Sequence, residues 1–156
     1  MKVIIAGGRN FKPKDRHVEW LRKIFKEINP TEIVSGGAKG ADKFGELIAD
    51  KFHIDKNIFK APWKEIIGKP WYEIKSNQYG DYWVKAGTYR NGQMARYADA
   101  CILFPGGSGT ANMRQQAEDN GLLVYAYEDR VLGKEEMDEL TQMIVDENTF
   151  MGRYKE

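Results

Sequence analysis

The stretch ACILFPGGSGT, residues 100–110, decides the fold of this chain. Five apolar residues predict a buried strand, and the sequence from Ala111 onward suits a helix. Between them, three of residues 106–110 are glycine, which lets the backbone come close to a ligand. A strand that runs through such a loop into a helix N-terminus presents unpaired N–H groups and a positive dipole end. We therefore expect a phosphate site formed by Pro105, Gly106, Gly107, Ser108, Gly109 and Thr110.

Outward from this stretch, short apolar runs alternate with helical periodicity. The expected strands are residues 2–6, 32–35, 57–61, 100–104 and 122–126. The expected helices are residues 18–28, 41–52, 88–97 and 111–120, with an acidic C-terminal helix at about 133–147. This alternation predicts an α/β fold: a Rossmann-like, doubly wound parallel sheet of about five strands with helices on both faces. The length suits a single domain over residues 1–156.

Three glycine-bearing loops, at residues 7–8, 36–40 and 106–109, each follow an expected strand. They should share the carboxyl edge of the sheet, where ligands bind in such folds. The glycine spacing of a dinucleotide-binding loop is absent after the first strand, and no loop has the Walker A pattern. The sequence thus predicts no nicotinamide or other cofactor.

The composition narrows the partners. Lys and Arg number 24 against 23 Asp and Glu, so a net charge of +1 disfavours nucleic acid and membrane surfaces. Residues 128–156 hold 9 acidic and 4 basic side chains, which leaves 14 and 20 in residues 1–127. One cysteine, Cys101, and two histidines, His17 and His53, predict neither a disulfide nor a metal site. We expect the cysteine to be buried and the histidines exposed.

The lack of a leader or membrane-spanning segment predicts a cytoplasmic protein.

Several motifs resemble one known family. They are Gly7-Gly8-Arg9-Asn10-Phe11, residues 34–42 (VSGGAKGAD) with Gly45-Glu46, residues 87–94 with Arg90, Asn91 and Met94, Ala98-Asp99-Ala100, and residues 104–110. In this order, from Lys2 to about Ala126, the chain is similar to the YspA/YpsA-related branch of the SLOG superfamily. That superfamily includes the LOG-type, lysine decarboxylase-like phosphoribohydrolases and the DNA-processing protein DprA. The resemblance implies a Rossmann-like fold, a nucleotide or nucleotide-derived ligand, and a homo-oligomer.

The chain departs from the hydrolases of that superfamily at one position. Their PGGxGTxxE pattern supplies a catalytic glutamate where this chain has Met113, whose thioether cannot transfer a proton. Their arginine corresponds to Arg90, which is retained. Asp42 and Glu46, four residues apart on one helix face, are candidate catalytic replacements. Alternatively, Asp42 caps the helix and Glu46 is solvated. Enzymatic activity therefore stays open.

Other side chains are candidates for ligand contact. Arg9 and Arg90 offer planar forks for phosphate, Lys39 a further charge, and Trp63 a ring for stacking on a base. The full set outside the PGGSGT loop comprises Gly8, Arg9, Ser35, Gly36, Gly37, Lys39, Gly40, Asp42, Trp63, Arg90 and Asn91.

An aromatic-rich insertion at about 66–86 interrupts the alternation, and we expect it to form a lid or a subunit interface. The leading hypothesis is a protein that senses or sequesters a nucleotide-like small molecule. One alternative is a nucleoside 5′-monophosphate phosphoribohydrolase, which would cleave the N-glycosidic bond. A second is single-stranded nucleic acid binding, which the near-neutral charge disfavours.

Overall fold

The sheet has five parallel strands in the order β3-β2-β1-β6-β7. The computed structural model describes residues 1–128 and residue 142. Apart from residue 142, the expected acidic helix at 133–147 lies outside the described residues. The strands are β1 (Lys2–Ala6), β2 (Glu32–Ser35), β3 (Asp55–Ile58), β6 (Ala100–Leu103) and β7 (Leu123–Ala126). The predicted Rossmann-like α/β sheet is thereby confirmed.

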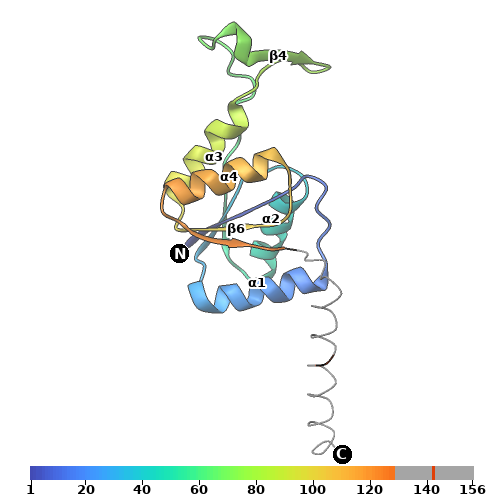
Figure 1. Cartoon of the computed structure of the whole chain (residues 1–156), viewed down its shortest axis with the longest axis vertical. Helices are drawn as coiled ribbons and strands as arrows, with labels where there is room; N and C mark the ends of the chain where they lie inside the picture. Colours follow the sequence, from blue (N-terminus) through green and yellow to red (C-terminus); the bar gives the residue numbers. More distant parts are fainter. Residues whose placement is uncertain (129–141, 143–156) are drawn as a thin grey trace, which may run out of the picture.

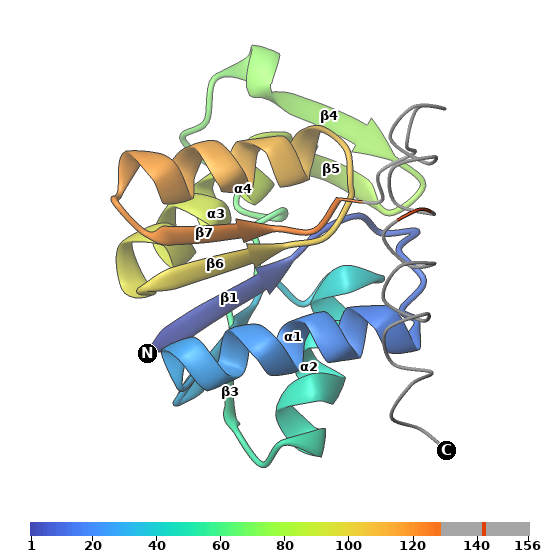
Figure 2. The same ribbon diagram turned by 60° about the horizontal axis from the view of Figure 1, so that its bottom comes forward.

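Within residues 1–128, four helices cover the two faces of the sheet (Figure 2). They are α1 (Asp15–Ile28), α2 (Ala41–Lys51), α3 (Ala86–Tyr97) and α4 (Ser108–Asp119). Successive residues of β1 point to opposite faces. Val3 and Ile5 belong to the apolar cluster with α1 and α2, whereas Ile4 packs with α3 and α4. Both faces of the sheet are therefore buried at its centre, as the apolar runs of β1 and β6 predict.

The buried cysteine is confirmed. Cys101 lies on β6 with no exposed surface, in the cluster formed with α3 and α4. Burial raises the pKa of its thiol to about 12. The thiol is therefore protonated at neutral pH and packs as a small apolar side chain.

The strand order reverses between β1 and β6. From β1 the chain moves to β2 and β3 on one side, and it returns to β6 and β7 on the other. Ile4 of β1 pairs with Val34 on one side and with Cys101 on the other. A reversal of this kind leaves a crevice at the carboxyl ends of the two central strands, because their loops diverge to opposite faces.

The aromatic insertion forms an arm. It contains a short 3-10 turn, η1 (Trp71–Glu73), and an antiparallel hairpin of β4 (Ile74–Asn77) and β5 (Gly80–Trp83). Figure 1 shows the arm projecting beyond α3, away from the sheet. Trp83 ties the hairpin to the 3-10 turn within the arm, because its indole N–H donates to the Glu73 carboxylate at 3.1 Å. The aromatic side chains Trp71, Tyr72 and Tyr79 remain exposed.

Two expectations about this part of the fold were inaccurate. The third strand spans residues 55–58 rather than 57–61, since β3 is an edge strand whose largely exposed, polar sequence lacks an apolar run. The aromatic insertion contains two strands that the sequence did not predict.

No helix within the described residues is long and apolar enough to span a membrane.

Candidate functional site

Three loops meet at Gly8, directly after β1. The Gly8 N–H donates to the Pro105 carbonyl at 2.9 Å, which joins the loop after β1 to the loop after β6. The Gly8 carbonyl accepts the N–H of Ala41 at 3.1 Å, which adds the start of α2. The backbone of one residue thus holds together the three glycine-bearing loops at the carboxyl edge of the sheet.

Two glycines make this contact possible. A Cβ at Gly40 would lie 2.2 Å from the Gly8 carbonyl oxygen, and φ at Gly40 is +76°. A Cβ at Gly106 would lie 2.1 Å from the Thr110 hydroxyl and 2.7 Å from the Gly8 nitrogen. No real Cβ fits at such distances, so both glycines are required for the close approach of the loops.

A cleft of about 1240 Å³ opens beside this junction. It lies between the glycine loops, the residues that lead into and out of the arm, and the adjoining parts of α3 and α4. The predicted site residues that line it are Gly8, Arg9, Gly36, Gly37, Lys39, Asp42, Trp63, Arg90, Asn91, Gly107, Ser108, Gly109 and Thr110. The predicted residues outside its lining are Ser35, Gly40, Glu46, Pro105 and Gly106.

Arg90 is held in place from two directions. Its Nη1 donates to the Gly36 carbonyl at 2.8 Å, and its Nε donates to the Asn91 side-chain oxygen at 3.3 Å. The buried Asn91 amide in turn donates to Asn112 at 3.0 Å and to the Gly109 carbonyl at 3.4 Å. Asn91 therefore braces the glycine loop against α3 as well as lining the cleft. Burial lowers the pKa of Arg90, and Asp42 opposes this by attraction.

The two candidate carboxylates have different surroundings. Both are buried, so the alternative in which Glu46 is a solvated surface residue is wrong. Glu46 accepts the Ser35 hydroxyl at 2.9 Å and contacts Lys43 at 3.4 Å, away from the cleft. Asp42 lines the cleft and accepts the Ala38 N–H at 3.2 Å. Gly40, not Asp42, is the N-cap of α2.

Asp42 has a perturbed acidity. Burial raises its pKa above the ordinary value of 3.8, although the Ala38 N–H and the Arg90 charge act in the opposite direction. Removing water from a carboxylate disfavours its charged form, and here that effect is the largest. The cleft therefore holds a carboxyl group that keeps its proton to higher pH than an ordinary aspartate does.

We expect this acidity to appear in the pH dependence of stability. As pH rises above about 3.8, the unfolded chain releases the Asp42 proton first, so the free energy of unfolding falls until the raised pKa of the folded state is passed. Asp42→Asn has no such proton, and its stability relative to wild type should increase across this window. Urea unfolding of both proteins from pH 3 to 7 measures the difference. A difference that does not change with pH would contradict the raised pKa.

Met113, which stands where the resemblance implies a glutamate in the hydrolases, belongs to the core. Met113 on α4 is 1% exposed and packs with the apolar cluster that includes Met94 and Ile4. Only the margin of this side chain contributes to the lining of the cleft. A packed apolar side chain therefore occupies the position at which the resemblance implies a glutamate in the hydrolases.

Some lining residues were not predicted. Asn10, Lys60, Ala61, Thr88 and Asn112 belong to them. Lys60 lies two residues beyond the end of β3, and placing that strand at 57–61 concealed its position in the loop at the sheet edge. Asn10 belongs to the Gly7-Gly8-Arg9-Asn10-Phe11 motif, so its position after the first strand could have indicated a place in the cleft.

His17 is a further correction. It was expected to be exposed but is buried at 2% exposure, with its ring 4.8 Å from that of Phe11 and 5.6 Å from that of Phe104. Its Nδ1 accepts the Lys14 N–H at 2.9 Å, which fixes the entry to α1. Helical periodicity alone could not show that Phe11, in the loop before α1, covers the face of α1 that carries His17. His53 is exposed, as predicted.

The strand order and the loops at its carboxyl edge define a Rossmann-like α/β fold with a cleft at the reversal point. Residues 1–65 match the family model of the YspA, cpYpsA-related SLOG family. The resemblance stated from the sequence is thereby confirmed for these residues. The match suggests nucleotide-related binding. Searches of curated proteins and of solved structures found no match to the chain. Within residues 1–128 and 142, no group of three metal-ligating side chains comes together.

Proposed function

We propose that this protein binds a nucleotide or nucleotide-derived ligand in the cleft, as a sensor or a sequestering protein. The phosphate would bind at the start of α4, on the amides of Ser108, Gly109 and Thr110. The guanidinium of Arg90 lies in the same cleft and would supply the balancing charge.

The observation that carries the proposal is the difference between two helix starts in one cleft. In the described part of the chain, neither α2 nor α4 has a side-chain cap at its N-terminus. At α2, however, the first amide, that of Ala41, donates to the Gly8 carbonyl. In the loop before it, the Gly37 N–H is bound by the Ser35 hydroxyl and the Ala38 N–H by Asp42. Uncapped amides at the positive end of a helix attract an anion, so phosphate is expected at α4 rather than at α2.

The base has a suitable position at the other end of the cleft. Trp63 is 37% exposed, lines the cleft, and lies against Gly87, where an added Cβ would be 3.4 Å from its ring. An indole that is half covered and half open offers one flat face for stacking on a base.

Gly107→Glu tests the phosphate site. A Cβ at Gly107 meets nothing within 4 Å, so a side chain fits there without disturbing the fold. We expect the added carboxylate to weaken the binding of nucleoside phosphates by about a hundredfold, or roughly 2.7 kcal/mol, because it repels phosphate and occupies its place. Calorimetric titration measures the loss.

Gly107→Gln is the matched control, since it has the same size without the charge. It should lose less affinity than Gly107→Glu, and both variants should unfold at the temperature of the wild type. Wild-type affinity in Gly107→Glu would exclude this loop as the phosphate site.

Hydrolysis remains the second candidate, and Asp42 is the observation that favours it. It is a cleft-lining carboxyl group with a raised pKa beside a cationic guanidinium, which are features of a proton donor for N-glycosidic cleavage. Chromatography of the titrated nucleoside monophosphates separates the two candidates. Free base and ribose 5-phosphate would show hydrolysis, whereas intact bound nucleotide would show binding alone.

A further inference from the structure

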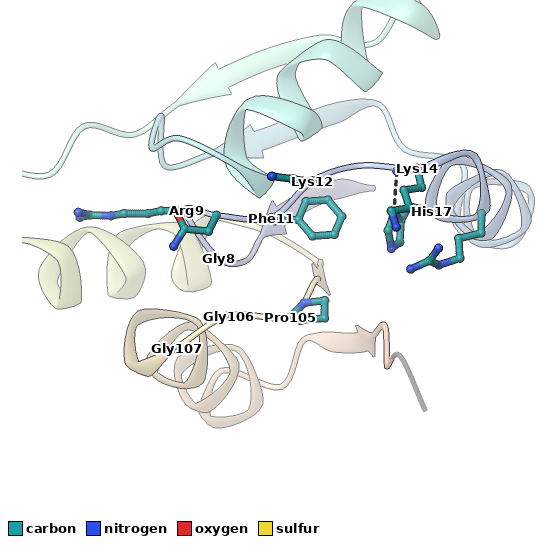
Figure 3. Close-up of a pocket in the computed structure, with 11 residues that line it drawn as sticks. Gly8, Arg9, Phe11, Lys12, Lys14, His17, Pro105, Gly106 and Gly107 are labelled. Carbon is teal, nitrogen blue, oxygen red and sulfur yellow. Dashed lines mark hydrogen bonds between the residues drawn. The ribbon is translucent and has the colours of Figure 1, made fainter. Parts of the chain in front are cut away.

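A second, smaller pocket of about 530 Å³ lies beside the first and has not been given a role. It shares Gly8, Arg9, Asn10 and Gly107 with the main cleft, so the two cavities meet above the junction of Gly8 with Pro105. Figure 3 shows the segment from Gly8 to Lys14 on one side of this pocket and residues 105–107 on the other. The smaller pocket is therefore a continuation of the proposed phosphate site.

The lining of this pocket is strongly cationic. Its described residues include Arg9, Lys12, Lys14 and Arg16 and contain no carboxylate. The Nε of Arg16 donates to the Tyr127 hydroxyl at 3.1 Å. Within residues 1–128 and 142, no ion pair is formed by Arg9, Lys12 or Lys14. The like charges of Arg9, Lys12 and Lys14 repel each other, and a bound anion would relieve that repulsion.

The backbone that carries these charges is held in a fixed position. The ring of Phe11 stacks on that of Phe104 at 4.6 Å, which attaches the loop to the end of β6. The N–H of Lys14 is bound by the buried His17. Because both ends of the loop are fixed, Lys12 and Lys14 extend from an ordered frame, and binding would cost only the ordering of their side chains.

We propose that this pocket binds a second phosphate group of the same ligand. The ligand class is then a nucleoside carrying a diphosphate or a longer phosphate chain, rather than a monophosphate. One phosphate would bind at the start of α4, and the next would pass Gly8 and Arg9 toward Lys12 and Lys14. This inference rests on the proposed function and specifies its ligand.

Titration of the mono- and diphosphates of the four ribonucleosides tests the inference. For at least one base, the diphosphate should bind the wild type about tenfold or more tightly than the monophosphate, the gain expected from charge-assisted hydrogen bonds to the second phosphate. The double variant Lys12→Ala/Lys14→Ala should reduce this preference to about threefold or less and leave the affinity for the monophosphate unchanged.

Lys23→Ala/Lys26→Ala is the control, because it removes two charges from exposed positions of α1 outside both cavities. It should retain the wild-type preference. Melting temperatures of both double variants establish that the fold is intact.

The outcomes separate the inference from the proposed function. Equal affinity of the wild type for mono- and diphosphates, with binding retained, overturns the second phosphate site alone. Absence of binding to every nucleotide overturns the proposed function and the inference with it. A preference for a short single-stranded oligonucleotide over every diphosphate overturns the inference in favour of nucleic acid.

Discussion

Replacing Gly40 with alanine is expected to lower the free energy of unfolding by about 3 kcal/mol, because two penalties combine. The backbone at Gly40 has φ +76° and ψ −122°, a conformation that residues with a Cβ rarely adopt. The new methyl group would also meet the carbonyl oxygens of Gly8 at 2.2 Å and Arg9 at 2.6 Å. These are backbone atoms, so no side-chain rotation can relieve the clash. Urea unfolding at neutral pH measures the loss.

Gly109→Ala is the matched control for this variant. An added Cβ at Gly109 has nothing within 4 Å, and the residue lies in the first turn of α4. Alanine favours the helix, so its stability should equal or exceed that of the wild type by up to about 1 kcal/mol. If Gly40→Ala were as stable as Gly109→Ala, the loops would not be held together by close packing at Gly8.

Met113→Glu is expected to lower the free energy of unfolding at pH 7 by about 3 kcal/mol or more, because it places a carboxylate among apolar side chains. The isosteric change Met113→Leu should cost less than about 1.5 kcal/mol. Burial would raise the pKa of the new carboxyl group, so the loss should shrink as pH falls toward the ordinary glutamate value of about 4.3. Urea unfolding of both variants at pH 4 and pH 7 measures this.

The comparison of the two variants decides what the methionine means. If Met113→Glu were as stable at pH 7 as Met113→Leu, the new carboxylate would have reached the cleft. The position would then still accept the glutamate of the hydrolases, and packing could not explain its replacement. A large loss confirms that the core now occupies this place.

The sheet was predictable because its central strands have a simple signal. Residues 3–6 and 100–104 are continuous apolar runs, and a strand buried on both faces requires such a run. The edge strand β3 needs no such run, which is why its predicted start was two residues too late and its predicted end three residues too late. The two strands of the arm gave no signal, although the aromatic insertion itself did, since these strands pair only with each other and bury little besides Trp83.

The candidate site was predictable in part. Glycine loops after parallel strands must gather at one edge, so the lining of the cleft by Gly36, Gly107 and their neighbours follows from the sequence. The sequence could not show which way a side chain on α2 points. The Glu46 side chain accepts the Ser35 hydroxyl and does not line the cleft, because Glu46 lies one helical turn further along α2 than Asp42.

The junction at Gly8 has a consequence for how the chain can be divided. The family match ends at residue 65. On the side of β1 away from β2, however, the neighbouring strand is β6, which lies nearly a hundred residues further along the chain. A fragment ending at residue 65 would leave β1 as a bare edge and Gly8 without the carbonyl of Pro105. Assembly of the cleft therefore depends on contacts of high sequence separation, which form late and cooperatively in folding.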